Sequence, residues 1–440
     1  MGRRIGSPAP HTRPRRRGPT RGRLAAALVL FALPVASAGC ASAGGDTDRQ
    51  GAPGGEEPSA TGNTANSEAP ESPDDDAPRD AEPFEGSIED FYVVPDGIER
   101  LGPGDLIRYQ VVEEDGDART VRVMYRSEDA SGRPRAVTGV VTHPNDPAPE
   151  GGWPVVSYGH GTTGMAPRCA PSRDPQPSPT WGIEAVGASS DYVGLGPEGE
   201  LHPYLSRLSE GNSMIDIVAA AGQLPGAGAG TEWVAVGHSQ GGHAALAARE
   251  LAAERAPELH LAGTVAIAPG VATDESYGLD EDLMTVLTMM QLHGAATERD
   301  DIDPADYMTA EALDKASVFD SGCVEEIIDA LTGVVADGPF EVDPWVTEPA
   351  AAALRANLVA RAGVDAGPVL LASGGADLTV VPQRVSATFD RLCELGQSVH
   401  LVEMPEADHG SIIPAAFDDI ESFLDTALNE PEAVIDDCAS

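Results

Sequence analysis

A serine lies between two glycines in the sequence Gly-His-Ser-Gln-Gly at residues 237–241, where it could act as a nucleophile. The apolar, β-branched residues 231–236 before it indicate a buried strand, and the alanine-rich residues 242–248 after it indicate a helix. A strand, a tight turn and a helix are the context of a nucleophile elbow, where a Cβ at either glycine would collide with the neighbouring strand or helix. We therefore predict that Ser239 is catalytic; the alternative is a structural turn that merely contains a serine.

A nucleophilic serine needs a base, which must itself be held by a third group. Downstream, residues 369–377 are a strand, a glycine loop and then Asp377, and residues 399–409 are a strand, a loop and then His409. Both side chains follow the carboxyl ends of predicted strands, where a crevice forms in an open α/β sheet. We predict that His409 accepts the proton of Ser239 and that Asp377 fixes the His409 tautomer. His238 and His243 are expected to have packing or supporting roles.

The negatively charged oxygen of a tetrahedral intermediate needs two backbone donors. One predicted donor is the N–H of Gln240, at the positive end of the helix that follows the serine. The other is expected in the loop at residues 157–164, where the sequence His-Gly-Thr-Thr-Gly lets the backbone approach a substrate. Thr162 or Gly161 is the predicted donor, and the alternative is an ordinary glycine-rich turn.

The elements that must position these residues alternate between strands and helices. Alternating apolar and polar residues predict antiparallel strands at 106–113, 121–126 and 137–143. More apolar runs predict buried strands at 154–159, 262–268, 368–372 and 398–403, and helices are expected at 209–224, at 242 to about 255 and at 414–428. This order predicts an α/β fold with a doubly wound, mostly parallel sheet.

About 100 residues separate two of the predicted strands, which is more than one crossover needs. We interpret residues 269–367 as a crossover and an inserted helical cap, and residues 84–268 and 368–440 as the core. The apolar run 283–290, which includes Met289, is suited to lining a substrate pocket; packing within the cap is the alternative.

The first 40 residues have the order of an export signal: eight arginines without an acid, a short apolar run, and small residues ending at Cys40. Cys40 resembles the lipid-modified cysteine of bacterial lipoproteins, and plain cleavage with secretion is the alternative. Residues 41–83 are acidic, rich in Gly and Pro, and nearly without large apolar side chains, so a disordered tether is expected there. An exported protein, on the cell surface or secreted, is therefore predicted.

The formal net charge is −43, which disfavours binding to nucleic acid and to anionic bilayers. Membrane association is expected only through a lipid on Cys40. Beyond Cys40, four cysteines remain without metal-binding spacing, and in an exported chain they predict two disulfides with three alternative pairings. The sequence predicts no metal and no cofactor, and it does not specify an oligomeric state.

Taken together, several motifs resemble those of the secretory lipase family, which groups fungal lipase A-type enzymes with bacterial exported esterases. The motifs are His-Gly-Thr-Thr-Gly at 160–164, Cys-Ala-Pro-Ser at 169–172, Asp-Tyr-Val-Gly-Leu-Gly at 191–196, His-Pro-Tyr-Leu at 202–205 and the elbow. The resemblance spans residues 85 to 430. It departs at Thr162, where some fungal members have an aspartate.

The resemblance implies an α/β-hydrolase core, a helical cap, and hydrolysis of carboxylic esters without a cofactor. It implies that Cys169 pairs with Cys323 and that Cys393 pairs with Cys438. It also suggests that Tyr192 and Leu195 line the substrate pocket.

Three functions are consistent with these residues. The leading hypothesis is a lipase or esterase that cleaves lipid or other hydrophobic acyl esters through an acyl-enzyme. The same triad could act on amide, peptide or polyester bonds, because the shape of the cap and pocket sets specificity. A catalytically silent surface binding protein is the third hypothesis, and the complete set of Ser239, Asp377 and His409 argues against it.

Overall fold

The computed structural model describes residues 81–114, 116–271, 281–335 and 338–439. The predicted export signal with Cys40, and the predicted tether up to residue 80, lie outside the described residues. The described chain begins with a short strand that pairs with β2, Glu82 opposite Arg108, so regular structure starts slightly before the predicted boundary at residue 84.

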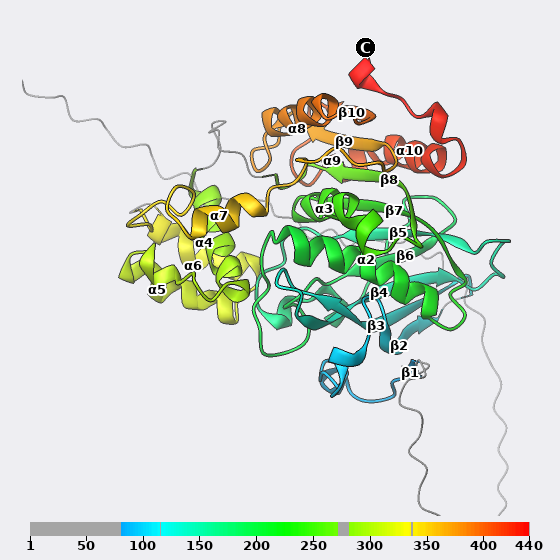
Figure 1. Cartoon of the computed structure of the whole chain (residues 1–440), viewed down its shortest axis with the longest axis horizontal. Helices are drawn as coiled ribbons and strands as arrows, with labels where there is room; N and C mark the ends of the chain where they lie inside the picture. The colour runs from blue at the N-terminus through cyan, green and yellow to red at the C-terminus, as the bar shows by residue number, and fades with distance from the viewer. Residues whose placement is uncertain (1–80, 115, 272–280, 336–337, 440) are drawn as a thin grey trace, which may run out of the picture.

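A ten-stranded sheet with helices on both faces forms the body of the molecule (Figure 1). Its strands are β1 (Glu82–Pro83), β2 (Leu106–Glu114), β3 (Ala118–Glu128), β4 (Pro134–Pro144), β5 (Trp153–Gly159), β6 (Val186–Ser190), β7 (Ala229–His238), β8 (His260–Ile267), β9 (Val369–Gly374) and β10 (Val399–Met404). The spatial order is β1-β2-β3-β4-β6-β5-β7-β8-β9-β10. Strands β6, β5 and β7 to β10 run parallel, whereas β2, β3 and β4 are antiparallel, which confirms the predicted mostly parallel sheet.

Helices cover the sheet and the ends of its strands. They are α1 (Ile88–Phe91), α2 (Arg207–Gln223), α3 (Gln240–Arg255), α4 (Glu281–Glu298), α5 (Ala310–Ala316), α6 (Val324–Val335), α7 (Ala350–Ala356), α8 (Pro382–Glu394), α9 (Ile412–Ala415) and α10 (Phe417–Asn429). The central strands are buried on both faces because successive side chains point to opposite sides. Val155 belongs to a hydrophobic cluster with Met214 of α2, whereas Val156 belongs to a second cluster with Phe423 of α10.

Helices α4 to α7 all lie between β8 and β9 in the sequence, within the segment that we predict to be a crossover and cap. Figure 1 shows them grouped beside the body of the sheet, at the left. Their side chains, such as Phe319 and Leu331, form a hydrophobic cluster of their own. The same cluster includes Met165, Tyr204 and Leu205 from loops of the core, so the helical group is anchored to the core by apolar packing.

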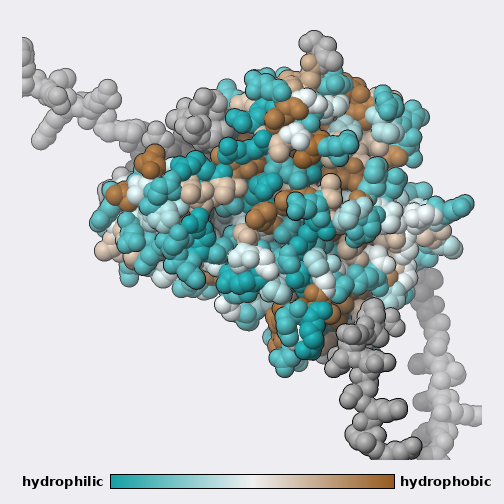
Figure 2. Space-filling view, in the orientation of Figure 1, coloured by the Kyte–Doolittle hydropathy of each residue, from teal (hydrophilic) through white to brown (hydrophobic). Residues whose placement is uncertain are grey.

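Hydrophilic residues predominate on the face shown in Figure 2, and hydrophobic residues are scattered among them. This surface agrees with the net charge of −43. Within the described ranges, no helix combines the length and the apolar character needed to cross a membrane.

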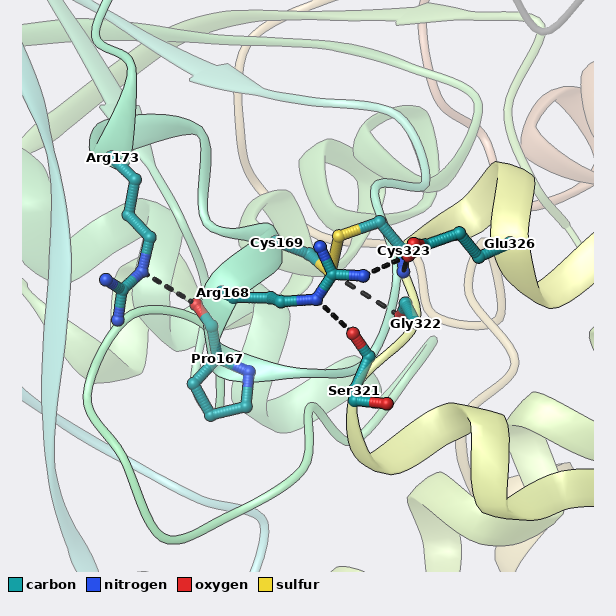
Figure 3. Close-up of a disulfide and its surroundings, with 8 residues drawn as sticks. All are labelled: Pro167, Arg168, Cys169, Arg173, Ser321, Gly322, Cys323 and Glu326. Atoms are coloured by element: carbon teal, nitrogen blue, oxygen red, sulfur yellow. Dashed lines mark hydrogen bonds and ion pairs between the residues drawn. A yellow bond between two sulfur atoms is a disulfide. The ribbon is translucent and has the colours of Figure 1, made fainter.

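Two disulfides join the cysteines in the pairs that the sequence resemblance implies. Cys169 is bonded to Cys323, which tethers the loop after β5 to the start of α6. Figure 3 shows that the neighbouring Arg168 reaches the same region, where it donates to the carbonyl of Ser321 and pairs with Glu326. Cys393 at the end of α8 is bonded to Cys438 near the C-terminus.

Removal of the first disulfide is expected to destabilise the protein more than removal of the second. The bonds close loops with sequence separations of 154 and 45 residues. The chain-entropy relation then gives losses of about 5 kcal/mol for Cys169→Ser/Cys323→Ser and about 4 kcal/mol for Cys393→Ser/Cys438→Ser. Urea unfolding of both double variants measures the free energies. A larger loss for the Cys393/Cys438 variant would contradict this ranking.

Candidate active site

Ser239 occupies a strained turn between strand β7 and helix α3. Its backbone φ is 57° and its ψ is −116°, a conformation that non-glycine residues rarely adopt. A Cβ built on Gly237 would overlap the carbonyl of Gly241, and one built on Gly241 would overlap the carbonyl of Gly159. Both glycines are therefore required by close backbone packing, as the sequence predicts, and the turn holds Ser239 at the carboxyl end of β7.

Ser239, His409 and Asp377 form a continuous hydrogen-bonded chain. The Ser239 Oγ lies 3.0 Å from His409 Nε2, and His409 Nδ1 lies 2.7 Å from Asp377 Oδ2. Asp377 follows β9 and His409 follows β10, and both side chains are buried. The other Asp377 oxygen, Oδ1, accepts hydrogen bonds from the backbone N–H groups of Thr379 and Val380. The structure therefore brings together the three residues that sequence order selects.

His238, beside the nucleophile, supports the loop that carries His409. Its Nε2 donates to the His409 carbonyl oxygen at 2.8 Å, and the two rings lie 4.6 Å apart between centroids. Burial, together with the nearby His409 ring, lowers the pKa of His238 to about 3. His238 is therefore neutral near pH 7, and it adds no charge beside the serine.

The predicted oxyanion residues lie close to Ser239. Gln240 is the first residue of α3, so its backbone N–H has no intrahelical acceptor. Thr162 lines the same cavity as Ser239, and its Oγ1 shares a 2.9 Å hydrogen bond with the Tyr204 hydroxyl. A Cβ built on Gly161 would lie 3.8 Å from the Cβ of Ser239. Two stretches of backbone with the required character therefore approach the nucleophile from different elements.

A buried acid that sequence reasoning missed, Glu210, lies beneath this site in the first turn of α2. Its Oε1 accepts hydrogen bonds from Gln240 Nε2 and from the Leu205 N–H, both at 2.8 Å. Its Oε2 lies 2.8 Å from His243 Nδ1. Burial acts to raise the pKa of Glu210, but contacts with His202 and His243 outweigh it and lower the pKa to about 2. Glu210 is therefore an ionised carboxylate inside the protein.

A cavity of about 1050 Å³ opens beside Ser239 and His409. Helix α4 forms one wall with five apolar residues and three polar ones: Leu283, Met284, Val286, Leu287 and Met290, with Thr285, Thr288 and Gln291. Four arginines and one aspartate also line it: Arg355, Arg361, Arg384, Arg391 and Asp343. The cavity is large enough for a drug-sized or lipid-like ligand, and its lining combines apolar side chains of α4 with several basic side chains.

Three residues predicted for the pocket are instead fully buried and do not line the cavity. The Tyr192 hydroxyl donates to the His160 carbonyl oxygen at 3.2 Å, so this side chain supports the loop that bears Gly161 and Thr162. Leu195 packs in the core cluster around α2. Met289 packs inside the cluster of α4 to α7, while its neighbours on α4 line the cavity. The conformation of the loop determines where the Tyr192 and Leu195 side chains point, and the rotation of α4 about its axis determines where Met289 points.

Metal chemistry has no candidate site within the described residues. No group of three or more His, Cys, Asp or Glu side chains in those ranges is arranged to hold a metal ion.

Comparison with models of known protein families identifies one family. A sequence profile described as secretory lipase matches residues 185–422. No curated protein matches the chain.

Similar solved structures include three hydrolases. Candida antarctica lipase A in its closed state is 17% identical, with a TM-score of 0.65 over 78% of this chain and 86% of that one. The rice cell wall degrading esterase LipA from Xanthomonas oryzae is 18% identical, with a TM-score of 0.59 over 75% and 100% of the chains. A putative hydrolase from Legionella pneumophila is 18% identical, with a TM-score of 0.58 over 74% and 92% of the chains. The chain therefore belongs to the secretory lipase family and has the α/β-hydrolase fold.

Proposed function

We propose that this protein is a serine hydrolase that cleaves carboxylic esters of hydrophobic acids through an acyl-enzyme. The observation that carries the proposal is the hydrogen-bonded chain of Ser239, His409 and Asp377 at the edge of a cavity with an apolar wall. Serine at its ordinary pKa is a weak nucleophile, and a neutral imidazole 3.0 Å away can accept its proton.

In the first step, Ser239 Oγ attacks the ester carbonyl while its proton moves to His409 Nε2. Asp377 accepts a hydrogen bond from His409 Nδ1, which keeps the lone pair on Nε2 and stabilises the imidazolium that forms. The C–O bond to the alcohol then breaks, and His409 gives its proton to the leaving alkoxide. A water molecule activated by His409 attacks the acyl-enzyme in the same way and releases the acid.

The negatively charged oxygen of each tetrahedral intermediate is assigned to the backbone N–H of Gln240 and to an N–H from Gly161 or Thr162. The Gln240 donor lies at the positive end of α3, a helix of 16 residues, which favours a developing negative charge. We further propose that the protein is exported and that Cys40 is its lipid attachment site. Two disulfides support an oxidising compartment.

The reaction class is tested by comparing the hydrolysis of p-nitrophenyl esters, from acetate to palmitate, with the hydrolysis of an aminoacyl p-nitroanilide, which is an amide. The expected result is ester hydrolysis with kcat/KM rising as the acyl chain extends along the apolar wall of α4, by about fifteenfold per pair of fully buried methylenes until the cavity is filled. Amide hydrolysis is expected to be much slower. Faster cleavage of the amide, or no cleavage of any ester, would reject the proposal.

A further inference from the structure

An oxyanion hole works only if its two donors keep a fixed separation. Here they come from elements far apart in the sequence: Gln240 opens helix α3, whereas Gly161 and Thr162 belong to the loop after β5. A displacement of about 1 Å in such a site can cost about 100-fold in rate. Some group must therefore keep the helix and the loop at a fixed separation.

One buried side chain contacts the helix through Gln240 itself. Gln240 Nε2 donates to Glu210 Oε1 at 2.8 Å and lies 2.7 Å from His202 Nε2. His202 Nδ1 lies 2.7 Å from the Val193 carbonyl oxygen, a contact that fixes the His202 ring beside Gln240. The Gln240 side chain is only 1% exposed, and its Nε2 is held between Glu210 and His202.

The same carboxylate also contacts the loop side. Glu210 Oε1 accepts the backbone N–H of Leu205 at 2.8 Å. The preceding residue, Tyr204, shares a hydrogen bond between its hydroxyl and Thr162 Oγ1. One oxygen atom of Glu210 is thus connected to Gln240 directly, and to Thr162 through the adjacent residues Leu205 and Tyr204.

Glu210 is itself held in place by His243. Nδ1 of the His243 ring lies 2.8 Å from Glu210 Oε2, and Nε2 lies 2.8 Å from the Asn357 carbonyl oxygen. Both side chains are almost fully buried. This contact therefore fixes the second carboxylate oxygen of Glu210 in the protein interior, where water does not compete for it.

We propose that Glu210 is a positioning residue that keeps the two donor elements of the oxyanion hole, helix α3 and the loop after β5, at a fixed separation. It touches neither substrate nor the reacting atoms; it acts through Gln240 and the 204–205 turn. The inference rests on the proposed ester hydrolase function. It concerns the stabilisation of the tetrahedral intermediate, so it predicts a loss in kcat with little change in KM.

The test replaces Glu210 with methionine, which keeps the side-chain length and removes both acceptors. Glu210→Met is expected to lower kcat for a p-nitrophenyl ester by about 100-fold, with KM within about threefold of wild type. Affinity for an alkyl trifluoromethyl ketone, which forms an oxyanion adduct with a catalytic serine, should fall by a similar factor. Glu210→Gln should recover most of the activity, because its amide oxygen can accept from Gln240 and Leu205 while its NH₂ takes the place of the carboxylate oxygen that faces His243.

Asp216→Leu is the matched control. Asp216 is a buried carboxylate on the same helix, and it pairs with Arg255 at the opposite end of helix α3 from Gln240. This variant should be less stable than the wild-type protein, but its kcat per active site should be unchanged. End-point labelling with a fluorophosphonate counts the active sites. If Glu210→Met fails to fold, Gln240→Met removes the same link from the helix side and should show the same loss in kcat.

Folded Glu210→Met or Gln240→Met enzyme with the kcat and inhibitor affinity of Asp216→Leu would overturn the inference, since a purely structural carboxylate would behave in that way. Equal losses in Glu210→Gln and Glu210→Met would also overturn it, because the acceptor geometry would then be irrelevant. Absence of ester hydrolysis by the wild-type protein would instead reject the proposed function itself.

Discussion

Replacing Ser239 with alanine is expected to lower kcat for ester hydrolysis by about 10⁴–10⁶-fold. The substitution removes the Oγ that attacks the carbonyl and accepts the acyl group, so no acyl-enzyme can form. Any residual rate would come from the oxyanion donors and from binding alone. Hydrolysis of p-nitrophenyl esters measures the loss, and a fluorophosphonate should no longer label the protein.

The folded structure should survive this change. Ser239 Oγ contacts His409 and lies at the edge of a cavity, so its removal leaves no void in the packed core. Alanine must adopt the same positive φ as serine, and the strain of the turn is therefore unchanged. Ser373→Ala, a change at a buried serine of strand β9, is the matched control and should keep its activity. Near-normal hydrolysis by Ser239→Ala would exclude Ser239 as the nucleophile.

The candidate triad could be predicted because each of its residues comes shortly after a strand that has a clear hydrophobic pattern. The sequence predicts a strand at 368–372, and the structure has β9 at Val369–Gly374, with Asp377 in the loop that follows it. The glycines of the elbow were also readable, since a strained turn packed between a strand and a helix excludes a Cβ. Local sequence therefore specified these elements, and the parallel topology placed their ends together.

Strand β6 (Val186–Ser190) was missed because its sequence, Val-Gly-Ala-Ser-Ser, has little β-branched or apolar character. It becomes a strand because it fills the space between β4 and β5 and pairs with both. Helix α8 could have been found, since Val385, Thr388 and Leu392 are buried at helical spacing. Pairing with neighbouring strands therefore determines β6, whereas the sequence of α8 contains a helical pattern that could have predicted it.

The buried Glu210 network could not be predicted from sequence. A glutamate in the first turn of a helix ordinarily indicates a solvated residue that favours the helix dipole. Its burial depends on Gln240 and His243, which both belong to helix α3, and on His202 in the loop before α2. The direction of the Tyr192 side chain could not be predicted either, because it depends on a backbone φ of 71° in an irregular loop.

Replacing Asp377 with asparagine is expected to lower kcat by about 10⁴-fold while leaving the fold intact. The neighbouring backbone dictates how the new amide must lie. The Thr379 and Val380 N–H groups donate to Oδ1, so the amide oxygen must stay there and the NH₂ must face His409 Nδ1. His409 then carries its proton on Nε2 and cannot accept the proton of Ser239.

Asp408→Asn is the control that separates the two neighbouring acids. Asp408 adjoins His409 in sequence, but its carboxylate caps the turn by accepting from the Ser411 N–H and hydroxyl. This variant should therefore keep kcat within about threefold of wild type, since it alters no group in the proton path. Ester hydrolysis and the rate of fluorophosphonate labelling measure both variants. A larger loss in Asp408→Asn than in Asp377→Asn would assign the supporting acid to Asp408, because only the acid that fixes the His409 tautomer is expected to have so large an effect on proton transfer.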